Sequence, residues 1–176
     1  MARCPCRRRA AWVRLRHGLR TILLASLLQA CAGLQSDSLR ISEQSIDGDP
    51  QRRASMLLVV QGLEADSNFE PDLARDLYQR ALQVDPQNAY AYLAIARHRV
   101  EGRNPLSALP FLDKARALLD VEGQLTPGAE AHLVGLRGAA LLADGQREEA
   151  LPHLSTARTL SPQVWSDGRL DAEELR

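Results

Sequence analysis

The chain has 176 residues, of which 45% are hydrophobic, 25% are charged and only 4% are aromatic. This composition is too apolar for a disordered chain, and abundant Ala and Leu beside few aromatic residues favour packed helices over a β-sandwich or barrel. The formal net charge is zero, but residues 1–30 hold seven Arg and no acidic residue, so residues 31–176 carry 15 basic and 22 acidic groups, a charge of −7 that argues against nucleic-acid binding.

Residues 1–30 are predicted to be a signal peptide. A basic region up to Arg20 precedes the largely apolar run 21–30, which is about half as long as a membrane-spanning helix must be. A basic region followed by a short apolar run is typical of a secretory leader.

The apolar run ends in Leu28-Gln29-Ala30-Cys31, which resembles the lipobox of bacterial lipoproteins. The resemblance implies cleavage before Cys31, attachment of a diacylglycerol to its thiol and acylation of its new amine. Several acyl chains anchor a protein stably to a membrane. Ala32 stands after the cysteine in place of Asp, which by the same resemblance implies the outer membrane, facing the periplasm.

Two other interpretations of the leader stay open, a plain secretory leader with a coincidental Cys and an Arg-rich mitochondrial presequence. The pair Arg8-Arg9 fits a twin-arginine signal poorly, because the residues that follow do not match. Cys4 and Cys6 also lie in the leader, so residues 32–176 contain no Cys for a disulfide or a metal site.

Residues 31–52 are predicted to be the lipidated Cys and a polar tether. Residues 32–52 are rich in Ser, Gln, Asp and Gly and poor in apolar residues, a composition typical of a linker.

The rest of the chain contains an internal repeat. Three sets of residues share spacings of four, three and, in the first and third sets, five residues, and successive sets lie 34 and 42 residues apart. The sets are Ala74, Tyr78, Ala81 and Pro86; Ala108, Leu112 and Ala115; and Ala150, Leu154, Ala157 and Pro162.

These sets resemble the second helix of the tetratricopeptide repeat (TPR), a 34-residue helix–turn–helix unit. Copies are predicted at about 55–88, 89–122 and 131–164, although Asp120 replaces the closing Pro in the second. The resemblance implies an all-α fold, a right-handed α-solenoid of about three repeats over residues 53–165, followed by a short C-terminal cap or tail, 166–176.

The positions of small residues and prolines support these predicted repeat boundaries. Gly62 and Gly138 are small where the two helices of a repeat should cross, and Ala81, Ala115 and Ala157 are expected to be buried at helix contacts. Prolines are expected at helix starts, where the missing N–H is harmless, and these are Pro71, Pro105 and Pro127. Pro110 and Pro152 fall about one turn further in, where a proline costs a hydrogen bond unless the helix starts late.

The sequence contains no P-loop, dinucleotide-binding fingerprint, zinc-protease His pair or nucleophile elbow. His98, His132 and His153 do not stand at i, i+4 spacing and are interpreted as ordinary helix residues. We therefore expect a binding protein and no enzyme, with no cofactor and no metal.

The TPR resemblance implies that the first helix of each repeat lines a concave groove that takes a peptide or an amphipathic helix. Tyr90 and Arg97 lie seven residues apart on one helix face and are the candidate anchors. Two alternatives stay open: residues 40–54 fold back and fill the groove, or a homodimer covers it. Repeat phase predicts eleven mostly apolar groove positions: Met56, Val59, Val60, Leu63, Tyr90, Leu93, Arg97, Val100, His132, Leu136 and Leu142.

By analogy of architecture, the resemblance implies a membrane-anchored protein–protein interaction scaffold that assists assembly of an envelope complex such as a pilus or a secretion system. The alternatives are a regulatory adaptor of a periplasmic cell-wall hydrolase and a mitochondrially targeted TPR protein. The expected partner is a protein, not a nucleic acid.

Overall fold

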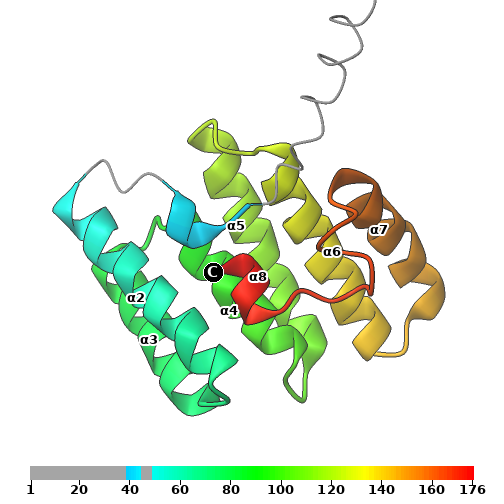
Figure 1. The fold of residues 1–176 in the computed structure, drawn as a ribbon, viewed down its shortest axis with the longest axis horizontal. Coiled ribbons are helices and arrows are strands. Elements are labelled where there is room, and N and C mark those ends of the chain that lie inside the picture. Colours follow the sequence, from blue (N-terminus) through cyan, green and yellow to red (C-terminus); the bar gives the residue numbers. More distant parts are fainter. Residues whose placement is uncertain (1–38, 45–48) are drawn as a thin grey trace, which may run out of the picture. The chain divides into compact units, whose positions relative to one another are not determined.

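The computed structural model describes residues 39–44 and 49–176. The predicted signal peptide and Cys31 lie outside the described residues. The described part of the chain is all-helical and contains no strand, which confirms the predicted fold class at that level (Figure 1). Its elements, where η marks a 3₁₀ helix, are η2 (Ile41–Glu43), α2 (Pro50–Ser67), α3 (Pro71–Val84), α4 (Ala89–Val100), η3 (Pro105–Ala108), α5 (Leu109–Val121), α6 (Pro127–Ala143), α7 (Arg147–Leu160) and α8 (Ala172–Leu175).

Helix starts are set by local sequence. Pro71 and Pro127 are in the first turns of α3 and α6, as predicted, and Thr126 caps α6 by accepting a hydrogen bond from the amide of Ala129. Asn88 caps α4 in the same way through the amides of Tyr90 and Ala91. These caps satisfy amides that have no partner inside the helix.

Pro110 and Pro152, which were expected about one turn inside helices, have different positions in the structure. Residues 105–108 form the 3₁₀ turn η3, and α5 begins only at Leu109, so Pro110 lies in the first turn and costs no hydrogen bond. Pro152 lies inside α7, where the carbonyl of the exposed residue Glu148 loses its partner.

The helices pack as three successive pairs, α2 with α3, α4 with η3 and α5, and α6 with α7. Residues 68–70, 101–104 and 144–146 connect the helices within each pair. The middle helix α4 also contacts α2 and α6, so the three first helices form one continuous layer (Figure 1).

Small residues allow the helices of a pair to approach closely. A Cβ at Gly62 would overlap the ring of Tyr78, and one at Gly138 would lie 2.9 Å from Cγ of Leu154. Ala81, Ala115 and Ala157 are completely buried, as predicted. The spacing of small residues therefore identified the helix contacts correctly.

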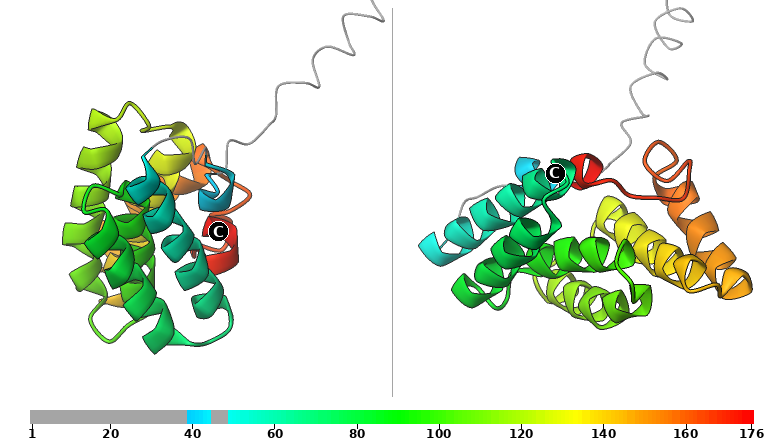
Figure 2. Two further views of the ribbon diagram at one scale, coloured as in Figure 1. Left: turned by 90° about the vertical axis from the view of Figure 1, so that its left-hand side faces the viewer. Right: turned by 90° about the horizontal axis from the view of Figure 1, so that it is seen from below.

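The C-terminal segment takes a path that the sequence did not indicate. Trp165 packs over Gly135 on α6, and the chain then runs back so that α8 contacts α2 in the first helix pair. The amide of Ser42 donates a 2.7 Å hydrogen bond to the carbonyl of Arg176. The right-hand view of Figure 2 shows α8 on the opposite side of the molecule from α5. Residues 166–176 thus span the layer of first helices and are more than a cap on the last pair.

Part of the predicted tether also packs against the body. Leu39 and Ile41 are 5% and 1% exposed, and α2 begins at Pro50, inside the range 31–52. Both side chains belong to the hydrophobic core.

Candidate binding surfaces

Most of the eleven predicted groove positions are not open to an outside partner. Val60 and Val100 are partly buried and Leu142 is 40% exposed. The expectation of an open groove is wrong for the other eight, which are buried: Met56, Val59, Leu63, Tyr90, Leu93, Arg97, His132 and Leu136. We call the face that these positions form on α2, α4 and α6 the inner face.

The inner face is covered by the chain itself. From the N-terminal side comes Ile41 in η2, and from the C-terminal side come Trp165, Leu170 and Leu175, each at most 5% exposed. The self-filling alternative is therefore closer to the structure than the open groove, although most of the cover comes from the C-terminal segment and not from residues 40–54. Apolar residues on the inner face bury their surface against these segments, which stabilises the fold.

A chain of hydrogen bonds attaches the segments that cover the inner face to α6. The indole Nε1 of Trp165 donates to Nδ1 of His132 at 3.3 Å, so Nε2 of His132 carries the proton and donates to the carbonyl of Leu39 at 3.0 Å. Burial lowers the pKa of His132, partly opposed by its bond to that carbonyl. His132 is thus a neutral link between the two covering segments.

A buried network of charged side chains holds the C-terminal covering segment at a second place. The carboxylate of Asp66 accepts hydrogen bonds from Arg97 at 2.8 Å and from Tyr78 at 2.9 Å, and it lies 2.9 Å from Nδ1 of His98. Arg97 also donates to the carbonyl of Leu170 at 3.2 Å. Burial, and then the charge of Asp66, raise the pKa of Tyr78. The candidate anchor Arg97 is therefore a structural link between α2, α4 and the C-terminal segment.

The other candidate anchor, Tyr90, is also enclosed. Its side chain is 4% exposed, and its hydroxyl lies 3.2 Å from Oε1 of Gln44 and 3.3 Å from Oε1 of Gln124. Burial raises the pKa of Tyr90. Tyr90 and Arg97 face the chain's own segments, because the apolar neighbours that suggested a groove bury themselves against those segments.

A small part of the inner face stays open. A hollow of about 440 Å³ remains between α4, α6 and residues 168–171. Four predicted groove residues line it, namely Arg97, Val100, Leu136 and Leu142. Its charges are mixed, because Glu101 and Asp171 line it together with Arg97 and Arg169.

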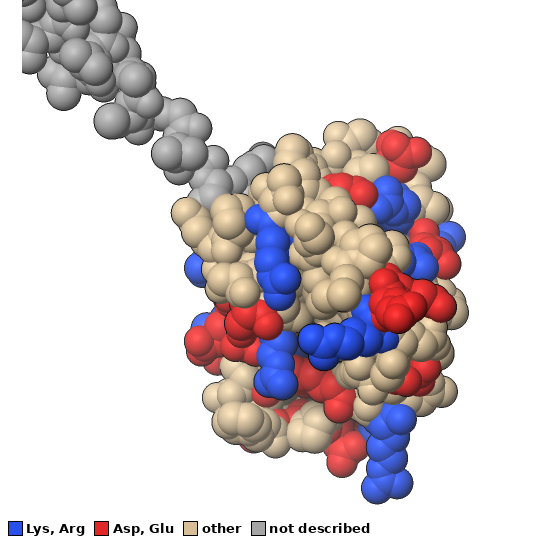
Figure 3. Space-filling model, turned by 90° about the vertical axis from the view of Figure 1, so that its right-hand side faces the viewer, with Lys and Arg blue, Asp and Glu red and all other residues tan. Residues whose placement is uncertain are grey.

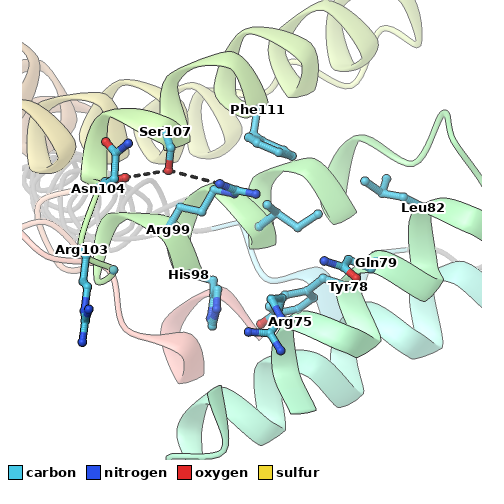
Figure 4. A pocket seen from close by; sticks show the side chains of 12 residues that line it. Arg75, Tyr78, Gln79, Leu82, His98, Arg99, Arg103, Asn104, Ser107 and Phe111 are labelled. Atoms are coloured by element: carbon cyan, nitrogen blue, oxygen red, sulfur yellow. Dashed lines mark hydrogen bonds between the residues drawn. The ribbon is translucent and has the colours of Figure 1, made fainter. Parts of the chain in front are cut away.

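A second hollow, of about 470 Å³, opens between α3 and α5, with α4 as its floor; we call it the α3–α5 hollow (Figure 4). Each of three segments contributes one helical face, which explains the spacings of three and four residues among the lining side chains. The lining comprises Arg75, Tyr78, Gln79 and Leu82 from α3; Ile95, His98 and Arg99 from α4; Gly102, Arg103 and Asn104 from the following loop; and Ser107 and Phe111 from η3 and α5.

The α3–α5 hollow combines an apolar interior with cationic side chains. The guanidinium carbon of Arg99 lies 4.6 Å from the centre of the Phe111 ring, and Arg99 donates to Oγ of Ser107 at 3.3 Å. Arg75 pairs with Asp72 at 2.8 Å, whereas neither Arg99 nor Arg103 pairs with a carboxylate of the described residues. None of the described residues that line the hollow is Asp or Glu.

Sequence reasoning missed this hollow because only the first helix of each repeat was considered as a binding face. One signal was available: Arg75, Gln79 and Leu82 lie on one face of α3, and Arg99 and Arg103 are four residues apart. It is weak, because the same spacing also occurs on solvated helix faces.

The three histidines of the helical body make contacts that support the fold. His98 contacts Asp66, His132 links Trp165 to Leu39, and Cβ of His153 lies close to Gly138. Within residues 39–44 and 49–176, no group of three or more His, Cys, Asp or Glu is placed to hold a metal ion. Among these same residues, no helix has the length and apolar character needed to cross a membrane.

No family model matches the chain, and no curated protein or solved structure matches it.

Proposed function

We propose that this chain is a lipid-anchored protein-interaction scaffold of the bacterial envelope, with a body built as a right-handed α-solenoid of three TPR-type repeats. Three successive helix pairs support the repeat architecture, because Ala81, Ala115 and Ala157 are buried at matching positions in all three. Gly62 and Gly138 support it further, since each lies directly against a side chain of the second helix of its pair.

The anchor is proposed at Cys31, on the resemblance of Leu28-Gln29-Ala30-Cys31 to a lipobox. The proposed location is the outer membrane, facing the periplasm, and the proposed role is to assist assembly of an envelope complex such as a pilus or a secretion system. A lipid on Cys31 would hold the helical body close to the membrane, where its partner would be recruited.

One observation carries the binding function: most of the apolar inner face is closed by the chain's own segments and keeps only a hollow of mixed charge, whereas the α3–α5 hollow is open and lined by apolar and cationic side chains. The volume of this hollow lies within the range of roughly 300–1,000 Å³ that is usual for ligand sites. It joins apolar side chains to a few polar groups, the combination that gives a binding site both affinity and orientation. We infer that the scaffold binds its partner mainly through this hollow.

Site-specific crosslinking in the native bacterium tests this proposal. A photoreactive amino acid replaces the exposed Gln79 at the hollow or, as the matched control, the exposed Ser155 on α7. The expected result is one envelope protein crosslinked through position 79 and not through position 155. Its purified form should then bind the purified chain in solution. Equal crosslinking at both positions, or none at position 79, would contradict the proposal.

A further inference from the structure

The chemistry of the α3–α5 hollow indicates what kind of partner segment it takes. Residues 31–176 carry a formal charge of −7, yet the side chains that line this hollow include three Arg and neither Asp nor Glu. Figure 3 shows the face at the α7 end, where acidic and basic side chains are mixed. The hollow therefore differs in charge from the rest of the body.

Arg99 is already held in position for an anion. Its guanidinium lies over the ring of Phe111 and donates to Ser107, whose hydroxyl in turn donates to the carbonyl of Asn104 at 2.6 Å (Figure 4). A guanidinium that is held by stacking loses little conformational freedom when a carboxylate binds. Because the Arg99 side chain makes one hydrogen bond to the described residues, its other N–H groups are available for a bidentate contact.

Arg103 and Arg75 provide further positive charge. Arg103 makes no ion pair with any described residue, and Figure 4 shows it at the opposite end of the hollow from Leu82. The charge of Arg75 is partly compensated by its pairs with Asp72 at 2.8 Å and Asp76 at 3.5 Å. The cationic groups thus lie along the hollow and not at one point, which fits several carboxylates along a chain better than one small anion.

The interior of the hollow is apolar. Ile95 is 7% exposed, and Leu82 and the ring of Phe111 are partly buried beside it. This arrangement leaves room for one apolar side chain between the cationic groups, and burying such a side chain contributes favourable free energy.

We propose that the α3–α5 hollow binds an acidic peptide segment of a partner protein, with one apolar side chain inserted between flanking carboxylates. This inference rests on the proposed function as a protein-interaction scaffold. An anionic lipid headgroup offers the same charge, but a membrane surface carrying such lipids would repel a body of charge −7. A peptide presents carboxylates and an apolar group in one short segment and places only that segment in the hollow.

The binding test uses the full chain with Cys31→Ser, purified in detergent, and a fluorescent peptide of about twelve residues in which a central Phe is flanked by Asp and Glu. Two matched peptides replace the acids by Asn and Gln, or the Phe by Ala. We expect both replacements to weaken binding at least about tenfold, and raised salt to weaken binding of the acidic peptide. Equal binding of the acidic and amide peptides would overturn the proposal.

Two double variants with equal loss of charge locate the site. Arg99→Gln with Arg103→Gln should raise the Kd of the acidic peptide at least about tenfold, whereas the control Arg80→Gln with Lys114→Gln, on exposed positions outside the hollow, should leave it within about twofold. Equal weakening by both would show unspecific attraction and overturn the proposal. Arg103→Gln alone changes an exposed side chain without an ion pair, so it tests the site even if Arg99→Gln disturbs the fold.

Failure of this inference is distinguishable from failure of the proposed function. If position 79 crosslinks a partner but the acidic peptide does not bind, the scaffold function stands and the ligand chemistry is wrong. If vesicles with about 30% phosphatidylserine bind through Arg99 and Arg103 while the peptide does not, the hollow is a lipid site and the inference is overturned. Absence of any crosslink at position 79 contradicts the proposed function itself.

Discussion

Trp165 and His132 lie 33 residues apart in the sequence and are joined by a 3.3 Å hydrogen bond from the indole Nε1 to the imidazole Nδ1. The indole is completely buried over Gly135, and the other nitrogen of His132 binds the carbonyl of Leu39. This relationship closes part of the inner face of the molecule, and it turns positions that were predicted to bind a partner into positions that hold the fold.

His132 should make stability depend on pH. Burial holds its pKa below the ordinary value near 6.5, so the unfolded chain binds a proton that the folded chain does not. The contribution of neutral, buried His132 to the free energy of unfolding is complete above about pH 6.5. It is lost as the pH falls toward the lower pKa that His132 has in the folded chain. We expect urea unfolding at pH 7.5 and 5.5 to show a smaller loss of stability in His132→Gln than in the parent chain. An equal loss in both would contradict the role of His132.

Removing the carboxylate of Asp66 should be costly. The side chains of Arg97 and Asp66 are 5% and 4% exposed, so Asp66→Asn leaves a buried guanidinium without its buried negative partner. We expect a loss of about 3 kcal/mol in the free energy of unfolding, measured by urea denaturation. The control Glu101→Gln removes the partly exposed partner of Arg97 and should cost less than about 1 kcal/mol. Similar losses of stability in both variants would show that the pair with Asp66 stabilises the fold no more than the pair with Glu101.

A methyl group at Gly135 should displace the C-terminal segment. A Cβ at this position would overlap the buried indole of Trp165. In a chain carrying Trp12→Phe, so that Trp165 alone reports, we expect Gly135→Ala to shift the emission to longer wavelength and to cost about 1–3 kcal/mol. Ser155→Ala on the exposed face of α7 is the control and should change neither quantity.

Two alanines of α5 test the helix contacts. Ala115 is completely buried and Ala117 is exposed on the same helix. We expect Ala115→Leu to overpack the core and cost about 1–3 kcal/mol, and Ala117→Leu to stay within about 0.5 kcal/mol of the parent. A tolerated leucine at position 115 would contradict the packing of α5.

The anchor at Cys31 has a direct chemical test. We expect the chain to incorporate a palmitate analogue and to fractionate with membranes in a bacterial host, and Cys31→Ser to do neither, because the acyl chains depend on this thiol. Cys4→Ser, in the same leader, is the control and should label normally. Labelling of Cys31→Ser at the parent level would remove the lipoprotein proposal.

The parts of the fold that could be predicted are those governed by local rules. The spacing of Ala81, Ala115 and Ala157 located the helix contacts, and Pro127 located the start of α6. Periodicity also identified Val59 and Leu93 as members of an apolar face, but it contains no information on what covers such a face. The cover depends on Trp165, which reaches its site through an irregular segment without periodicity.

The sequence indicated the α3–α5 hollow only weakly, for a related reason. Its floor and walls come from α3, α4 and α5, and the position of Phe111 over Arg99 depends on the 3₁₀ turn η3, which delays the start of α5. A shift of one turn in that start would point different side chains into the hollow.

The most direct test of the account compares the two hollows by filling each with a bulky side chain. Gln79→Trp fills the α3–α5 hollow, and Leu142→Trp fills the remaining hollow of the inner face; both positions are exposed. The measurement is the Kd of the partner identified by crosslinking, for both variants and the parent chain. Gln79→Trp should weaken binding at least about thirtyfold, or about 2 kcal/mol, and Leu142→Trp should leave it unchanged. Weakening by Leu142→Trp with full binding by Gln79→Trp would place the partner on the inner face and contradict the account.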